Sequence, residues 1–141
     1  MIPASKQRLF VLFCLFCWAA AGLPASASAA PAGREISLEK RSPDHVWTLR
    51  LPDRPGVVQV SLTVRDAAGR PAQGGSVTGE VWMPEMRMQG YPLELRFEEA
   101  DGGNYLALVQ FGHGGYWRIR ALFRDDGGQV VEQSFDFTLA D

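Results

Sequence analysis

Residues 104–124 read NYLALVQF, GHGG and YWRIRALFR in succession, two runs of alternating apolar and polar residues separated by a glycine-rich turn. A period of two is typical of a β-strand that buries one face, and glycine allows the backbone angles that a chain reversal requires. The stretch therefore predicts two strands, 104–111 and 116–124. The residues expected to face the core are Tyr105, Ala107, Val109, Phe111, Trp117, Ile119, Ala121 and Phe123.

The same alternation extends through most of the chain, and no window after residue 30 has the 3.6-residue apolar period of a helix. The other predicted strands are 46–51, 57–64, 77–83, 93–98 and 129–139. Turns rich in glycine and aspartate separate them at 53–56, 66–69, 74–75, 101–103 and 125–128. About seven short strands with frequent turns predict an all-β fold, an immunoglobulin-like two-sheet sandwich. The segment 101–105, DGGNY, also resembles a tyrosine corner, in which a tyrosine hydroxyl bonds to the backbone just upstream.

The first 29 residues have the three parts of a secretory signal peptide. Lys6 and Arg8 form a charged start, 9–23 is an apolar run, and Ala27-Ser28-Ala29 supplies a small-residue cleavage site. Fifteen residues span about 22 Å as a helix, which is less than the hydrocarbon core of a bilayer. We therefore expect a signal helix that is cleaved near Ala29, a periplasmic product and no stable membrane anchor after cleavage. Residues 30–44 are expected to form a tether or a frayed first strand, and 45–141 the sandwich domain.

Cleavage would change the composition of the protein in two ways. It would remove Cys14 and Cys17, which are the only cysteines, so the domain would have no disulfide. It would also remove Lys6 and Arg8 from the 14 basic residues, leaving 12 against 16 acidic ones. An acidic domain is a poor match for nucleic acid or an anionic membrane. Motifs of nucleophilic, zinc and nucleotide chemistry are also missing from the sequence, so we do not expect an enzyme.

Residues 81–90, VWMPEMRMQG, contain every methionine that follows Met1, namely Met83, Met86 and Met88. Pro84 lacks a backbone donor and should end the preceding strand, which places the next residues in an exposed loop. Thioether sulfur is a soft ligand that favours Cu(I). His113, in the FGHGG turn, offers an imidazole as a fourth donor. The sequence therefore predicts a Cu(I) site formed by Met83, Met86, Met88 and His113, provided that the two loops emerge at the same end of the sandwich.

Other interpretations of these residues remain open. Met83 continues the inward face of Val77 and Val81, so a role in the core is equally compatible with the pattern. Trp82 points away from Met83 on an ideal strand, where it would shield the metal or pack under a loop. His45 lies far from the methionines in the sequence and is left unassigned.

Five segments, in order and spacing, resemble the YtkA-like group of exported bacterial domains, which is related to the soluble part of FixH-type proteins. They are Val64–Pro71 (VRDAAGRP), Gly74-Gly75, the Met83-Pro84-x-Met86-x-Met88 loop, Gly103-Asn-Tyr105 and Gly115-Tyr-Trp117, and the resemblance covers about 57–137. It implies an immunoglobulin-like sandwich linked with copper handling, and with assembly or regulation of terminal oxidases and metal efflux. In that family a histidine often lies near the methionine-proline element and a methionine in the later loop. Here Met88 and His113 occupy the exchanged positions.

The leading hypothesis is therefore a periplasmic, non-enzymatic protein that buffers Cu(I) or delivers it to an envelope protein, such as an oxidase assembly or metal efflux component. The alternative is an immunoglobulin-like interaction or accessory domain of an envelope transporter or oxidase assembly system, without bound metal. In that case the methionines and Trp82 would form an apolar contact surface. A third hypothesis is an accessory domain that binds a sugar or another small ligand through exposed aromatic residues such as Tyr91 and Tyr116.

Overall fold

The computed structural model describes residues 33–86 and 92–141. The predicted signal peptide, Met88 and Tyr91 lie outside these ranges. Within them, no helix has the length and apolar character needed to cross a membrane.

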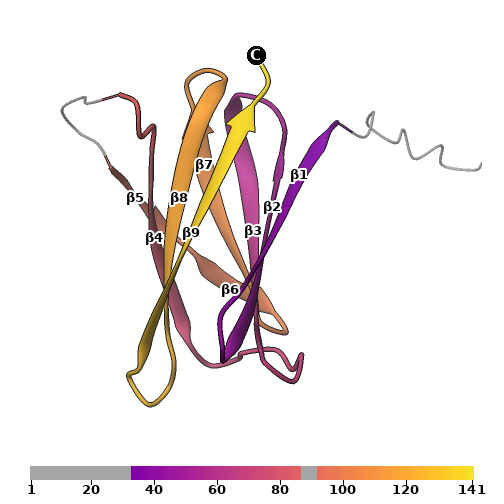
Figure 1. Cartoon of the computed structure of the whole chain (residues 1–141), viewed down its shortest axis with the longest axis vertical. Helices are drawn as coiled ribbons and strands as arrows, with labels where there is room; N and C mark the ends of the chain where they lie inside the picture. Colours follow the sequence, from indigo (N-terminus) through magenta and orange to yellow (C-terminus); the bar gives the residue numbers. More distant parts are fainter. Residues whose placement is uncertain (1–32, 87–91) are drawn as a thin grey trace, which may run out of the picture. The chain divides into compact units, whose positions relative to one another are not determined.

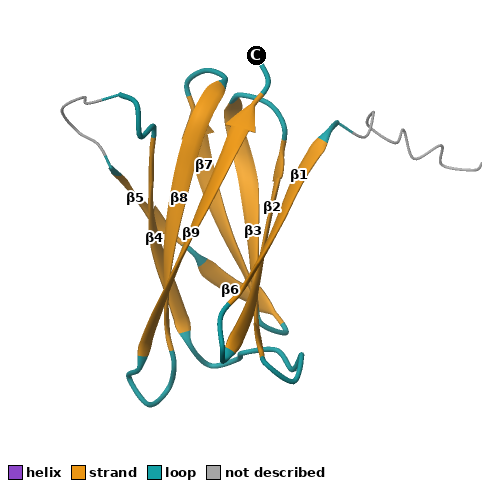
Figure 2. Cartoon of the chain, viewed as in Figure 1, coloured by secondary structure: helices purple, strands orange, loops and turns teal. Residues whose placement is uncertain are grey.

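In the described residues, nine strands form two antiparallel sheets that pack face to face (Figures 1 and 2). In chain order they are β1 (Glu35–Arg41), β2 (His45–Pro52), β3 (Gly56–Asp66), β4 (Ser76–Trp82), β5 (Leu93–Arg96), β6 (Glu98–Asp101), β7 (Asn104–Phe111), β8 (Gly115–Arg124) and β9 (Val130–Leu139). The first sheet has the order β1-β2-β3-β7-β6, and the second has the order β5-β4-β8-β9. Without β1, this is the strand arrangement of an immunoglobulin-like sandwich, so the predicted fold class is confirmed.

The structure has two strands more than the alternation predicted. β1 lies within the segment 30–44 and pairs along its whole length with β2. Its last three residues are charged and exposed. An edge strand can carry such residues, since it is held mainly by backbone hydrogen bonds to one neighbour and needs little apolar surface. The predicted strand 93–98 is divided into β5 and β6, which belong to different sheets. Phe97 between them is buried, so the chain crosses from one sheet to the other around a side chain that stays in the core.

Alternate residues of both sheets meet in one core, as the period of two predicted. Its largest fully buried side chains are Trp47, Trp117, Tyr105, Phe111, Phe123 and Phe135. No polar or charged residue among those described is buried. Leu93 was predicted to face inward but is exposed, because it begins the short edge strand β5.

Tyr105 does not form the predicted tyrosine corner, so that prediction is wrong. Its hydroxyl donates to the carbonyl oxygen of Ala72 at 2.9 Å, in the distant connection between β3 and β4. Gly103 allows this connection to pass close by, since an added Cβ would lie 3.1 Å from the Ala72 nitrogen. Burial, with the charges of Glu99 and Asp126, raises the pKa of the Tyr105 hydroxyl, which therefore remains a neutral donor at physiological pH.

Two turns lie at the end of the sandwich opposite the β7–β8 connection, and both combine an aspartate acceptor with a glycine of positive φ. In the first, the Asp66 carboxylate accepts the Arg70 N–H at 2.9 Å, and Gly69 has a φ of 81°. In the second, the Asp125 carboxylate accepts the Gln129 N–H at 2.8 Å, and Gly128 has a φ of 83°. Each aspartate thus closes its own turn, as the aspartate-glycine pattern predicted.

Candidate metal site

The two loops that carry the predicted ligands emerge at the same end of the sandwich. β4 ends at Trp82, which pairs with Arg118 near the start of β8, so the end of β4 lies at the same end of the sandwich as the β7–β8 connection (Figure 1). The Met83 side chain is partly buried against the core. Its methyl carbon lies 3.0 Å from the position that a Cβ on Gly115 would occupy. The structure therefore places Met83 beside the loop that contains His113.

Met83 and Met86 belong to one tight turn. The Met86 N–H donates to the Met83 carbonyl oxygen at 3.0 Å, and Pro84 occupies the second position, where its fixed φ favours a turn. The first and last residues of such a turn have Cα atoms less than about 7 Å apart. Met86 is 41% exposed, whereas Met83 packs against the core, so the two thioethers differ in their access to solvent. Met88, the third predicted sulfur ligand, lies outside the described residues.

His113 is exposed on the β7–β8 loop with one ring nitrogen already engaged. Its Nδ1 lies 2.6 Å from the Gly114 carbonyl oxygen. A carbonyl oxygen only accepts hydrogen bonds, so this contact favours the neutral tautomer with the proton on Nδ1, in which Nε2 has the lone pair. Histidine ligands of metals usually have this arrangement, in which the second ring nitrogen donates to a carbonyl or carboxylate.

The loop around His113 is supported by Trp117. The indole Nε1–H donates to the His113 carbonyl oxygen at 3.3 Å, and the two ring centroids are 6.0 Å apart. The sequence predicted Trp117 only as a core residue. The sequence feature that could have indicated this contact is the spacing of four residues between His113 and Trp117 across a glycine-rich turn.

His45 lies at the opposite end of the sandwich from Met83. It begins β2 and pairs with Asp66 at the end of β3. Its ring packs against Phe123, with 5.8 Å between the ring centroids. It therefore does not contribute to a site with the methionines. The described residues also contain no group of three His, Cys, Asp or Glu side chains that could hold a metal ion.

Trp82 is engaged on the outer face of the second sheet. The guanidinium carbons of Arg118 and Arg120 each lie 5.9 Å from the centre of its indole ring. These arginines are paired in turn with acidic residues. Arg118 donates to both oxygens of Asp136, at 2.5 and 3.0 Å, and this contact lowers the pKa of the Asp136 carboxyl. Among the described residues, Trp82 thus contacts two arginines of β8.

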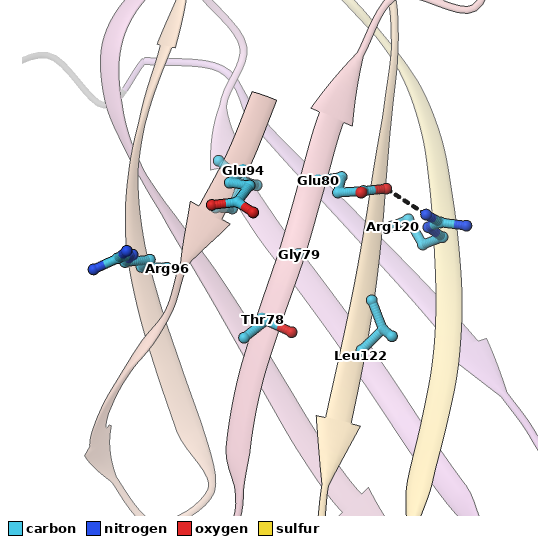
Figure 3. Close-up of a pocket in the computed structure, with 8 residues that line it drawn as sticks. Thr78, Gly79, Glu80, Glu94, Arg96, Arg120 and Leu122 are labelled. Carbon is cyan, nitrogen blue, oxygen red and sulfur yellow. Dashed lines mark hydrogen bonds and ion pairs between the residues drawn. The ribbon is translucent and has the colours of Figure 1, made fainter. Parts of the chain in front are cut away.

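A shallow pocket lies on the outer face of β5, β4 and β8 (Figure 3). Figure 3 shows Glu80 paired with Arg120 across it, while Glu94 stands opposite Glu80 on the edge strand. Its lining mixes both charges and has no sulfur or imidazole. Since Met83 packs inward against the core, this pocket is separate from the candidate metal site.

An apolar strip formed by Val57 and Leu108 lies on the outer face of the first sheet. The two side chains are 62% and 73% exposed. The β3–β7 register pairs Val57 with Gln110 and Gln59 with Leu108, so the two apolar residues are diagonal neighbours.

Comparisons with known proteins place the chain in a structural and sequence context. Residues 20–137 match the family model described as FixH. No curated protein matches the sequence.

Three solved structures share the fold. FetP from uropathogenic E. coli strain F11 is 9% identical with a TM-score of 0.55, covering 76% of this chain and 97% of that one. A DUF4426 family protein from Pseudomonas aeruginosa PAO1 is 16% identical with a TM-score of 0.55, covering 72% and 96%. The soluble domain of PmoD from Methylocystis sp. is 11% identical with a TM-score of 0.51, covering 74% and 98%.

Proposed function

The chain belongs to the FixH family, and from this premise we propose that it is an exported, non-enzymatic protein that binds one Cu(I) ion. Its role would be to buffer the metal or deliver it to a partner. The main support for the proposal is that the turn after β4 lies beside the β7–β8 loop. Met83 and Met86 share one turn, and Met83 contacts the loop on which His113 keeps Nε2 free.

The donor set supports Cu(I) in particular. Two thioethers and one imidazole are soft and borderline ligands, and harder cations prefer carboxylate and carbonyl oxygen. The partly buried Met83 would anchor the metal where water has limited access. The exposed Met86 would remain within reach of a partner that takes the metal by ligand exchange. Met88 would supply the third sulfur.

Export and the kind of partner are proposed from the sequence and the family. The signal pattern in 1–29 would send the domain to the periplasm and remove both cysteines, which leaves methionine and histidine as its soft or borderline donors. The family resemblance to copper handling in oxidase assembly and metal efflux suggests an envelope protein of one of these systems as the partner.

Titration of residues 30–141 with Cu(I) against a competing chelator tests the proposal. We expect one bound equivalent, with affinity lowered about tenfold or more by Met86→Leu, since the loss of one ligand should cost at least as much as the loss of a supporting contact. Glu85→Gln is the matched control, because it changes the same turn without removing sulfur. A wild-type domain that does not compete for Cu(I) would contradict the proposal, as would an unchanged affinity in Met86→Leu.

The exposed apolar strip favours a second candidate, an accessory domain that binds an envelope protein without metal. Val57 and Leu108 are large apolar side chains on a flat sheet face, which is where a partner can bury them.

A photo-reactive amino acid at position 108 should crosslink to one envelope protein in cells. The same group at exposed position 138, on the outer face of the other sheet, should not. Crosslinking at 108 by a protein that binds no Cu(I) would favour this candidate over the first. Equal products at both positions would argue against it.

A further inference from the structure

Residues that follow the last strand pack directly on the His113 loop. Gly114 is buried, and a Cβ on it would lie 2.9 Å from the Ala140 carbonyl oxygen and 2.5 Å from Oδ1 of Asp141. No side chain fits at position 114 while these residues stay in place. The loop is thus held from one side by the Trp117 indole and from the other by Ala140 and Asp141.

Ala140 is held in turn by Asp53, which lies in a turn between two strands of the other sheet. The Ala140 N–H donates to Oδ1 of Asp53 at 2.8 Å, across 87 positions of sequence. Asp53 lies in the β2–β3 turn, and its own N–H donates to the Arg34 carbonyl oxygen at 2.7 Å. Its carboxylate is only 11% exposed, although Arg34, whose Nε lies 4.0 Å away, is 86% exposed. Asp53 therefore connects the residue before β1, through its backbone N–H, with the residue after β9, through its mostly covered carboxylate.

The contacts of Asp53 differ from those of the other turn aspartates. Asp66 and Asp125 each accept N–H groups within four residues and close their own turns. The Asp53 carboxylate accepts a backbone N–H from a strand end in the opposite sheet. The Asp53 side chain therefore stabilises the packing at one end of the sandwich, and it does not hold the conformation of its own turn.

We propose that Asp53 is a positioning residue for His113. Its hydrogen bond to Ala140 keeps Ala140 and Asp141 against Gly114. These contacts restrict the loop to the conformation in which Nδ1 of His113 donates to the Gly114 carbonyl oxygen. Metal binding at Nε2 then requires little reordering of the loop. This inference rests on the proposed function, which supplies the reason for holding His113.

The experiment compares Asp53→Ala and Asp53→Asn with Asp66→Ala in the otherwise unchanged domain, residues 30–141. Asp66→Ala is the matched control, because it also removes a carboxylate that accepts backbone N–H groups, at the far end of the sandwich. Metal-free readouts are amide hydrogen exchange at Gly112–Gly115 and the ¹⁵N shifts of the His113 ring, which report its tautomer. Circular dichroism checks that each variant is folded.

In Asp53→Ala we expect exchange at Gly114 to become at least about tenfold faster, the ring to lose its preference for a protonated Nδ1, and Cu(I) affinity to fall about tenfold. Asp53→Asn, which keeps the acceptor oxygen and loses the charge, should show smaller changes in the same direction. Asp66→Ala should leave all three readouts within about twofold of wild type.

Unchanged hydrogen exchange at Gly114 and an unchanged His113 tautomer in Asp53→Ala would overturn the inference. Equal changes of these readouts in Asp66→Ala would also overturn it. If the loop loosens while Cu(I) affinity stays the same, Asp53 does not position a metal ligand. If the wild-type domain binds no Cu(I), the proposed function fails, whereas the exchange and ring measurements still decide whether Asp53 holds His113.

Discussion

Replacing Trp117 with alanine should lower the free energy of unfolding by about 3–5 kcal/mol, because the substitution leaves a large cavity in a packed core. Trp117 is 1% exposed, and its ring meets that of Phe111 edge to face with 5.0 Å between the centroids. The substitution also removes the donor to the His113 carbonyl oxygen. Small domains are stable by only about 5–15 kcal/mol, so the expected loss is a large share of the total.

Urea denaturation followed by circular dichroism measures this change, with Leu108→Ala as the control. Leu108 is 73% exposed, so its truncation should change stability by no more than about 0.5 kcal/mol. A loss below about 1 kcal/mol in Trp117→Ala would show that this end of the core is more loosely packed than the structure indicates. Comparable losses in both variants would contradict the placement of the two side chains.

The triple substitution Met83→Leu, Met86→Leu and His113→Ala should weaken Cu(I) binding by at least about 1,000-fold, or about 4 kcal/mol. It removes every proposed ligand within the described residues and leaves Met88 as the single sulfur donor. Leucine has nearly the volume of methionine, so the packing of position 83 against Gly115 should survive with little change in stability. A loss of binding without a loss of folding would identify these side chains as the ligands.

Chelator competition measures the affinity, and thermal unfolding of the metal-free proteins provides the control for folding. Met83→Leu alone separates the two interpretations of that residue, because a purely structural methionine would leave the affinity unchanged. X-ray absorption of the Cu(I)-loaded wild type should show both sulfur and nitrogen neighbours. A triple variant that binds within tenfold of wild type would mean that the metal is held elsewhere.

Several parts of the candidate site could be predicted from the sequence because they depend on residue type and short spacing. Pro84 between two methionines indicated the end of β4 and a turn. The glycines around His113 indicated a loop that passes close to another segment. Whether the two loops share one end depends on the pairing of β4 with β8, which no local pattern specifies. The contact of Met83 with Gly115 and the link from Asp53 to Ala140 join residues more than 30 positions apart.

The sequence by itself predicted most of the strands, most of their inward-facing residues and the turns between them. Side-chain alternation and the backbone preferences of glycine, proline and aspartate act over a few residues. They can therefore be recognised in one segment without knowing which other segment packs against it. Tertiary structure alone decided that β5 and β6 belong to different sheets, that β1 joins the first sheet, and that Tyr105 bonds to Ala72. These features are set by hydrogen bonds and packing between distant segments, whose energies depend on which surfaces meet when the two sheets close on one core.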